Sequence, residues 1–377
     1  MILNNINVIN FRNYRKHSIS FSPGINVIIG DNAQGKTNIL ESIYVLAITK
    51  SYRTNNDINL IKFNEDLFVI KGNIKTNSII KDLQLSFNGI KKYTKINSKQ
   101  IKRISDYITN FNVILFAPED LEIIKGSPSI RRNLLNIDIG QINRSYVNTL
   151  NEFNKILKSR NDYLKMMLIN SYSDDRYLNI LTDSLIEREI PIYMSRFNFV
   201  NKINKLIDDI FYSITGIRGL HIDYLSNIDL DFSSIDKLKI SIKKKYLKEK
   251  NKEINQGMTL FGPNRDDFVF YIEDKDMKNF SSQGQQKLAI ISLKLAEISI
   301  FYEETGEYPV LLLDDIFSEL DKYKKNRLIK YLNKDIQVII TSNDTKDISK
   351  KLLDDAKIFK IISGQIIEKE GNKYGRN

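Results

Sequence analysis

A glycine-framed loop near the N-terminus carries the strongest chemical signal in the sequence. Residues 30–37 read GDNAQGKT and fit the pattern G-x-x-x-x-G-K-[ST], between an apolar run and an amphipathic helical pattern. Glycine allows the backbone to curl tightly, so that successive amide N–H groups point at a phosphate. Lys36 can then reach the β- and γ-phosphates of a nucleoside triphosphate, and the Thr37 hydroxyl can ligate Mg²⁺. The alternative is a chance match in a loop that contains glycine. The expected nucleotide contacts are Gly30, Asp31, Asn32, Ala33, Gln34, Gly35, Lys36, Thr37 and Asn38.

Two adjacent carboxylates follow a short apolar run late in the chain. Val310 to Leu313 are apolar, and Asp314 and Asp315 come next. We expect a buried strand with acids at its C-terminal end, which is where ligands bind in open α/β sheets. Asp314 is expected to hold Mg²⁺ together with Thr37, and Asp315 to polarise the water that attacks the phosphate. Taken alone, the pattern also fits a strand followed by an Asp-rich turn.

A third candidate opens a long helix. Residues 281–286 read SSQGQQ, and small polar residues at a helix start can bind an anion. Ser282 is equally suited to cap the helix with no further role, and by itself the segment favours that interpretation.

The composition excludes several kinds of chemistry. The 377 residues include no cysteine and two histidines, His17 and His221, which excludes disulfides, thiol catalysis, iron–sulfur clusters and multi-histidine metal sites. The formal net charge of +11 favours a polyanionic partner such as nucleic acid or a lipid surface, although it also fits a merely solubilising charge. No secretory signal and no run long enough to cross a membrane are visible, so we expect a cytoplasmic protein with no membrane partner.

The apolar patterns place these motifs on expected elements. The strands are expected on both sides of a turn near Asn13 and at 25–29, 113–116, 221–225, 238–242, 268–272, 310–313 and 338–340. An antiparallel meander is expected over 67–97, with a type I′ turn at Asn88 and Gly89. The helices are expected after the glycine loop, with Ile39, Leu40 and Ile43 on one face, throughout 129–214, and at 285–302 and 322–332.

The alternation of strands and helices at both ends of the chain predicts one α/β domain with an insertion. We expect its N-terminal part at 1–125, a mainly helical inserted lobe at 126–256, and its C-terminal part at 257–377.

The order of the motifs resembles the ABC-type ATPases. Lys36 comes first, Ser282 follows, then Asp314, and 318–321 read SELD. The resemblance implies an ABC-type ATPase head of mixed β-sheets, with 282–285 as its signature motif and 318–321 as its D-loop. It also implies that Ser282, with Gly284 and Gln285, caps the ATP bound by a second subunit. Lys36, Asp315 and Ser282 would then be the catalytic residues.

Longer matches resemble the RecF family of bacterial recombination mediators and cover nearly the whole chain. They are NFRNYR at 10–15, the loop and helix at 30–44, SYRT at 51–54, LFAPEDLEIIKGSPSIRR at 115–132, SRND at 159–162, GPNRDD at 262–267, SSQGQQK at 281–287 and LLLDDIFSELD at 311–321. This resemblance implies a slow, DNA-stimulated ATPase that dimerises on ATP, binds gapped or junction DNA, and works with RecR and RecO to load RecA.

The resemblance also suggests an adenine or α-phosphate contact by the segment near Asn10. Arg12 and Asn13, with Asn10 and Tyr14, are the candidates, and an ordinary strand-to-turn segment is the alternative. The sequence departs from the family pattern at Asn264, where histidine is usual, and after Ile340, where Thr341, Ser342 and Asn343 replace any switch histidine.

Basic residues are the candidates for DNA contact. One cluster is Lys91, Lys92, Lys95, Lys99, Lys102 and Arg103, a second spans 243–252, and a third is Arg131, Arg132, Lys158 and Arg160. Each cluster also fits a solvated face. No base-reading motif is visible, so the contacts are expected to be to phosphates and to weaken with salt. A transporter ATPase subunit, a nucleotide switch with negligible turnover and an SMC-type structural protein remain as alternatives.

Overall fold

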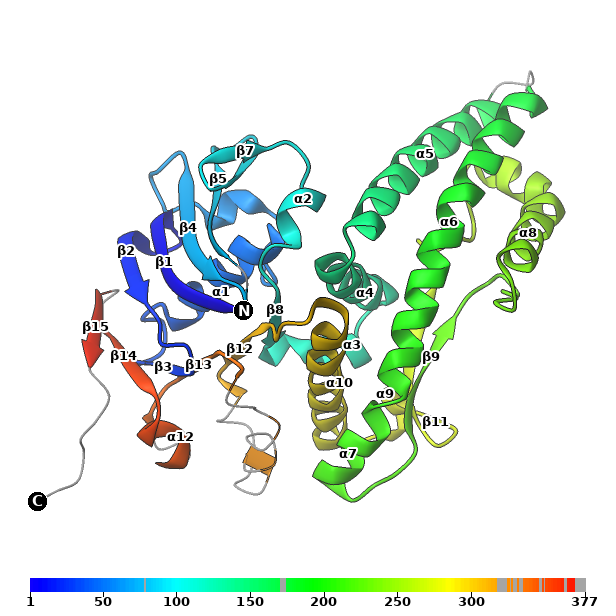
Figure 1. Cartoon of the computed structure of the whole chain (residues 1–377). Helices are drawn as coiled ribbons and strands as arrows, with labels where there is room; N and C mark the ends of the chain where they lie inside the picture. The colour runs from blue at the N-terminus through cyan, green and yellow to red at the C-terminus, as the bar shows by residue number, and fades with distance from the viewer. Residues whose placement is uncertain are drawn as a thin grey trace, which may run out of the picture. The chain divides into compact units, whose positions relative to one another are not determined.

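The computed structural model describes residues 1–77, 79–169, 174–316, 324–325, 327, 331, 335–345, 348, 350–362 and 365–369. By its internal contacts the chain divides into two compact units, whose helices and strands are labelled in Figure 1. Unit 1 comprises Met1–Leu121, Asp209–Ile217 and Lys287–Asn377, and unit 2 comprises Glu122–Asp208 and Arg218–Gln286. Residues 257–286 belong to unit 2, whereas the sequence analysis expected the α/β part to resume at residue 257. The reason is that the strand Asp267–Ile272 pairs with the strand Leu220–Leu225 of unit 2.

Unit 1 contains an antiparallel sheet of six strands. In order across the sheet these are β2 (Tyr14–Ser20), β1 (Ile2–Phe11), β4 (Phe68–Lys75), β5 (Ile80–Phe87), β6 (Lys92–Ile96) and β7 (Lys99–Ile101). The expected meander is therefore confirmed. The type I′ turn is wrong, because Phe87 pairs with Lys92 and leaves a four-residue loop in which only Gly89 has positive φ.

The second sheet of unit 1 is mainly parallel. Its order is β15 (Gln365–Lys369), β14 (Lys357–Ile362), β3 (Ile25–Ile29), β13 (Val338–Ser342), β12 (Val310–Asp314) and β8 (Val113–Phe116), with only β15 antiparallel to its neighbour. Strands β13, β12 and β8 are short, mainly apolar runs in which every residue is buried, as is usual when both faces of a sheet are covered.

Helix α1 (Lys36–Ile48) packs between the two sheets. It contacts β1, β4 and β5 on one side and β8, β12 and β13 on the other. Every residue from Ile39 to Ile48 is buried, including Glu41 and Ser42, so the helix is buried all round and not amphipathic as expected. This position holds the start of the helix rigidly beside the parallel sheet.

Among the described residues, the other helical segments of unit 1 are η1 (Asp57–Leu60), α2 (Ser105–Ile108), η2 (Pro118–Leu121), most of α7 (Ile207–Thr215), most of α10 (Gln283–Thr305) and α12 (Lys350–Asp354). The expected D-loop at 318–321 lies outside the described residues, as does most of the expected helix at 322–332.

Unit 2 is built from long helices and a small antiparallel sheet. The helices are α3 (Glu122–Lys125), α4 (Pro128–Ile142), α5 (Arg144–Ile169), α6 (Asp175–Asn204), α8 (Ile235–Gln256) and α9 (Met277–Phe280), and the sheet order is β11 (Lys275–Asp276), β10 (Asp267–Ile272) and β9 (Leu220–Leu225). The expected helical character of 129–214 is confirmed over the described residues.

The expected strand at 238–242 is wrong, because this segment lies in α8. Leu238, Ile242 and Tyr246 are buried at four-residue spacing, which is the period of one helix face. The Ser234 side chain caps the helix by accepting from the Lys237 amide.

Candidate nucleotide-binding site

Three adjacent parallel strands bring distant segments to one edge of the second sheet. Strand β13 lies between β3 and β12, with Ser342 opposite Ile29 and Thr341 opposite Asp314. The glycine loop follows β3, Asp315 follows β12, and Asn343 follows β13. The C-terminal ends of parallel strands are the usual ligand-binding edge, so all three segments face one site.

The glycine loop depends on its two glycines for steric reasons. Gly35 has φ of 111°, and a Cβ there would lie 2.7 Å from both Asn13 Nδ2 and Tyr14 Oη. A Cβ on Gly30 would lie 2.6 Å from the carbonyl oxygen of Ile361. Because α1 begins at Lys36, directly after this loop, its amide groups and dipole make the loop suitable for an anion.

Lys36 is held inside the loop. Its ammonium group donates to the carbonyl oxygens of Gly30 at 2.6 Å and Asp31 at 2.9 Å, and to Asn343 Oδ1 at 3.0 Å. The side chain is buried, and this desolvation lowers the pKa of Lys36 against the raising effects of Asp315, Asp314 and Asp31. Asn343, one of the three residues that stand where a switch histidine was expected, therefore lies beside Lys36.

Asp314 accepts hydrogen bonds from three hydroxyl groups. Its Oδ1 accepts from Thr37 at 3.0 Å and from Thr341 at 2.6 Å, and its Oδ2 accepts from Tyr52 at 3.1 Å. The structure thus brings together Thr37 and Asp314, the two expected magnesium ligands. Hydroxyl and carboxylate oxygens are the donors that Mg²⁺ takes, alongside water and nucleotide phosphates, so the residues present fit this ion.

Tyr52 is a residue that the sequence analysis did not assign to the site. Burial, followed by the charge of Asp314, raises the pKa of Tyr52 well above its usual range, so the hydroxyl remains a donor. The ring also packs edge-on against Tyr44, with centroids 5.4 Å apart. Its location within the SYRT motif was the available sequence signal.

Asp315 adopts an unusual backbone conformation at the end of β12. Its φ is 50°, in the left-handed region that costs free energy for a residue other than glycine. Its amide donates to Thr341 Oγ1 at 3.1 Å, so one threonine hydroxyl contacts both aspartates. Asp315 is half-buried beside the loop, and its expected role as the base stays a prediction.

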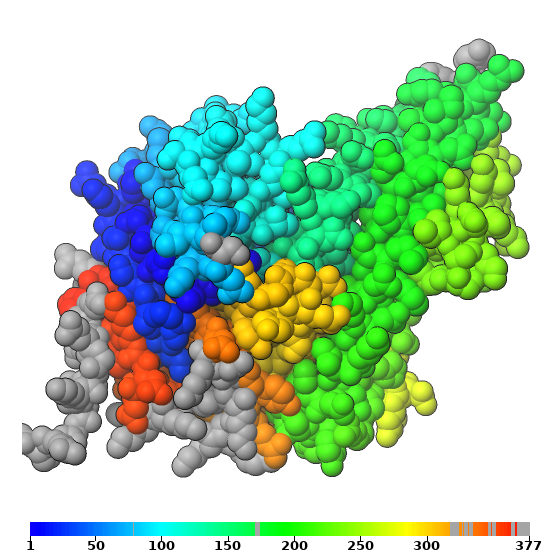
Figure 2. Space-filling view, in the orientation of Figure 1, coloured from blue at the N-terminus to red at the C-terminus, as the bar shows by residue number. Residues whose placement is uncertain are grey.

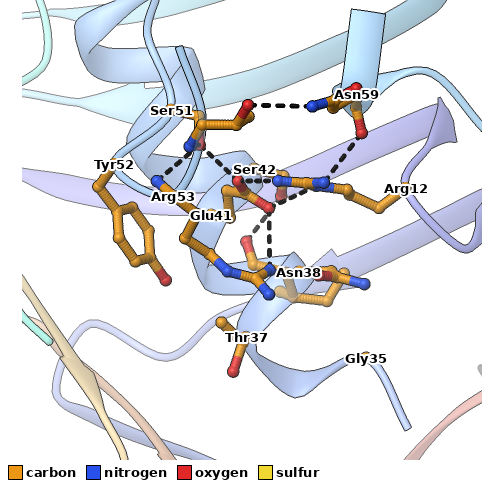
Figure 3. A network of polar contacts seen from close by, with 12 residues as sticks. Arg12, Gly35, Thr37, Asn38, Glu41, Ser42, Ser51, Tyr52, Arg53 and Asn59 are labelled. Carbon is orange, nitrogen blue, oxygen red and sulfur yellow. Dashed lines mark hydrogen bonds and ion pairs between the residues drawn. The ribbon is translucent and has the colours of Figure 1, made fainter. Parts of the chain in front are cut away.

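Glu41 is the centre of a polar network on α1, shown in Figure 3. Its carboxylate is fully buried and accepts from Arg12 Nε and Nη2 at 2.8 and 2.6 Å, from Ser51 at 2.5 Å, and from Arg53 at 3.3 Å. The Arg12 guanidinium is therefore paired with Glu41, and its expected nucleotide contact stays a prediction. The network ties the turn after β1 and the SYRT segment to the helix that carries the loop.

The turn after β1 also contacts the glycine loop directly. Asn13 Nδ2 donates to the Gln34 carbonyl at 3.4 Å, and its Oδ1 accepts from Asn38 at 2.8 Å. Asn10 instead bonds to Glu65 at 2.9 Å. Asp31, Asn32 and Ala33 form the exposed part of the loop.

Ser282 caps α10. Its Oγ accepts from the Gln285 amide at 3.3 Å, and its own amide donates to Gln285 Oε1 at 2.9 Å, which is a reciprocal capping box. Ser282 and Gly284 are exposed. Ser282 belongs to unit 2 and the glycine loop to unit 1, so the expected contact with ATP stays a prediction.

Two of the basic residues expected to contact DNA are internal. Arg131 is 5% exposed and pairs with both carboxylate oxygens of Asp267 at 2.6 and 2.8 Å. Arg160 is 1% exposed and pairs with Glu253 at 2.6 Å. The prediction for these two residues is wrong, because a buried and paired guanidinium cannot reach a phosphate.

The GPNRDD segment has a structural role in the same region. Asp267 binds Arg131, Asp266 accepts from Tyr224 and Ser226 at 2.8 and 2.9 Å, and the Pro263 carbonyl accepts from Arg196 at 2.6 Å. These contacts connect α4, α6 and β9 within unit 2.

The described residues contain no group of three or more His, Asp or Glu side chains arranged to hold a metal ion. None of their helices has the length and apolarity needed to cross a membrane.

Comparisons with known proteins place the chain in a family. The family model of the RecF/RecN/SMC N-terminal domain matches residues 2–365. The chain is 41% identical to the DNA replication and repair protein RecF of Ligilactobacillus salivarius, over 98% of each chain, and 42% identical to that of an Exiguobacterium species, over 97% and 99%.

Solved structures agree with these sequence matches. A structure of the recombination mediator protein RecF-ATP in the RecFOR pathway superposes with a TM-score of 0.90 at 33% identity, covering 97% of each chain. An Smc head bound to a domain of ScpA shares the fold, with a TM-score of 0.54 at 14% identity over 98% of each chain. The family model and the full-length relatives together show that this chain belongs to the RecF family of DNA replication and repair proteins.

Proposed function

We propose that the chain is an ATP-dependent DNA-binding protein of recombinational repair. One observation carries the proposal: the Thr37 hydroxyl, at the start of α1, donates to Asp314 Oδ1 at 3.0 Å, although the two residues are 277 positions apart in the chain. The buried Lys36 ammonium is held in the adjoining loop. The solved relative in complex with ATP supports the same ligand here.

The residues of the site have distinct roles in this proposal. Lys36 and the amide groups at the start of α1 neutralise the β- and γ-phosphates. The phosphate oxygens would replace the loop carbonyls as the acceptors of the Lys36 ammonium group. Thr37 and Asp314 would hold Mg²⁺, which supplies charge neutralisation on the phosphate oxygens. Asp315 orients the attacking water and accepts its proton. Because aspartate is one methylene shorter than glutamate, we expect slow hydrolysis.

Dimerisation on ATP is the second part of the proposal. Ser282 is exposed at the start of α10, where the helix dipole favours an anion, and it lies in the unit that does not contain the glycine loop. We propose that Ser282 and Gly284 of a second copy cap the γ-phosphate, so that ATP binding closes a homodimer and hydrolysis opens it.

The partner of the closed dimer is proposed to be DNA at gaps or at junctions between single and double strands. The net charge of +11 and the names of the relatives support this assignment. RecR and RecO are the proposed protein partners, with RecA loading, replication recovery and SOS induction as the outcome.

The Asp315→Asn variant tests the cycle. We expect it to bind ATP but to hydrolyse it at least about a hundredfold more slowly, because general-base catalysis is worth about 10²–10⁴-fold. It should therefore retain gapped DNA after ATP addition for longer than the parent. Turnover is measured by phosphate release, and DNA retention by fluorescence anisotropy with and without ATP. Hydrolysis at the parental rate would remove Asp315 from the mechanism, and DNA binding indifferent to ATP would contradict the proposed cycle.

A further inference from the structure

Helix α8 carries two groups of lysines with different surroundings. Lys239, Lys243 and Lys250 face α6 and pair with its carboxylates. The Lys243–Asp183 and Lys250–Asp175 distances are 3.1 and 2.9 Å, and Lys239 pairs with Glu187. The charges of this group are therefore neutralised within unit 2, where α6 and α8 pack together (Figure 1).

The second group lies on another face of the same helix. Lys244, Lys248 and Lys252 are exposed at four-residue spacing, and together they form a lysine stripe. Within the described part of the chain, none of the three makes a hydrogen bond or an ion pair. Part of α8 is visible at the surface in yellow-green in Figure 2.

The acidic residues of α8 do not compensate the stripe. Glu249 pairs with Lys245 at 3.4 Å, the buried Glu253 pairs with Arg160, and Asp236 lies in the first turn of the helix. Like charges four residues apart on a helix repel each other, so the stripe weakens the helix unless an anion is bound. An external polyanion would remove that repulsion.

The spacing of the stripe indicates the kind of anion. With a rise of about 1.5 Å per residue, the three lysines span about 12 Å along one helix face. A line of charges of this length fits an extended polyanion better than a single phosphate group. We propose that Lys244, Lys248 and Lys252 contact the DNA backbone, an inference that rests on the proposed DNA-binding function and adds a surface to it.

The two lysine groups provide a matched experiment. One variant changes Lys244, Lys248 and Lys252 to glutamine, and its control changes Lys239, Lys243 and Lys250 to glutamine, so both lose the same net charge from the same helix. Duplex DNA binding is measured by anisotropy between about 50 and 200 mM salt, and each lysine–phosphate contact contributes about 0.9 to the slope of log affinity against log salt.

The stripe variant should lower that slope by about 2 to 3, so the parent should lose about 40-fold more affinity than the variant across this salt range. The control should keep the parental slope. The single change Lys248→Gln, with an expected slope change of about 0.9, gives the same test with less effect on folding. Equal slopes in the parent and the stripe variant, or an equal decrease in both triple variants, would overturn the proposed DNA contact by the lysine stripe. Either result would leave the proposed DNA-binding function standing. A parent that does not bind DNA at the lowest salt concentration would overturn the proposed DNA-binding function as well.

Discussion

At the scale of residues, the geometry around Asp314 is the most informative feature of the molecule. Three hydroxyl groups from three segments, those of Thr37, Tyr52 and Thr341, donate to one carboxylate. In the proposed magnesium site, such contacts would fix the rotamer of the Asp314 carboxylate, and hydrogen-bond partners of a metal ligand usually contribute to metal affinity. Tyr52 differs from the two threonines because it reaches the opposite carboxylate oxygen.

The Tyr52→Phe variant isolates that contact by removing only the hydroxyl. We expect the Mg²⁺ concentration for half-maximal ATPase activity to rise about tenfold, because outer partners of metal ligands contribute about 10–100-fold. The rate at saturating Mg²⁺ should change much less. Activity is measured across a magnesium titration.

Tyr107→Phe is the control for Tyr52→Phe, since it removes the hydroxyl of a different tyrosine of unit 1, which is buried. A Tyr52→Phe variant with parental magnesium dependence, or a control that shifts it equally, would exclude a positioning role for Tyr52.

At the scale of elements, α6 and α8 enclose a buried carboxyl group. Glu189 of α6 is fully buried and accepts from Tyr246 of α8 at 2.7 Å. The neighbouring Gly262 has φ of 113°, and a Cβ there would lie 2.7 Å from Glu189 Oε1. Burial raises the pKa of Glu189 to about 8. The charges of Asp266 and Glu253 also raise this pKa, and the charge of Arg160 lowers it.

The raised pKa predicts a pH dependence of stability. The folded state retains a proton on Glu189 that the unfolded chain has lost, because glutamate in water has an ordinary pKa of 4.5. The contribution of protonated Glu189 to the free energy of unfolding is therefore present at low pH. It is lost as the pH rises from 4.5 towards 8, at up to about 1.4 kcal/mol per pH unit. Burial also raises the pKa of Asp266, to about 6, so the interval from pH 6 to 8 reports mainly on Glu189.

Glu189→Gln should remove this pH dependence, because glutamine keeps the shape and cannot ionise. Thermal unfolding monitored by circular dichroism should show a melting temperature that decreases from pH 6 to 8 in the parent and changes less in the variant. Glu187→Gln, on an exposed position of the same helix, should keep the parental slope. Identical slopes in all three proteins would exclude Glu189 as the titrating group.

At the scale of the whole molecule, the division into two units separates the motifs of the proposed ATP cycle. Lys36 and Asp314 belong to unit 1 and Ser282 to unit 2. In the proposed dimer, one copy would supply the glycine loop and the other the start of α10.

Ser282→Arg tests this arrangement. The added side chain should prevent closure on ATP, so that sedimentation velocity shows a monomer with ATP where the parent forms a dimer. Ser234→Arg is a matched control, since Ser234 is also an exposed helix cap in unit 2 and its loss should cost a similar amount, about 1 kcal/mol. An ATP-induced dimer that forms equally well in Ser282→Arg would contradict capping by a second copy.

The sequence by itself predicted the parts of the site that depend on local patterns. The strand, glycine loop and helix at 25–48 are contiguous, so their chemistry can be read from neighbouring residues. Asp314 could be added because an apolar run ending in acids predicts the C-terminal end of a buried parallel strand. The resemblance to the RecF family also came from the sequence and is confirmed by the comparisons.

Only the tertiary structure decided which distant side chains meet. The Tyr52–Asp314, Asn343–Lys36 and Arg12–Glu41 contacts join segments whose spacing in the chain carries no geometric information. The burial of Arg131 and Arg160, and the division of the α8 lysines into paired and unpaired groups, depend in the same way on packing within unit 2. Local patterns set the strands and helices because they reflect backbone and face periodicity, whereas pairing and burial of charges are set by which elements pack together.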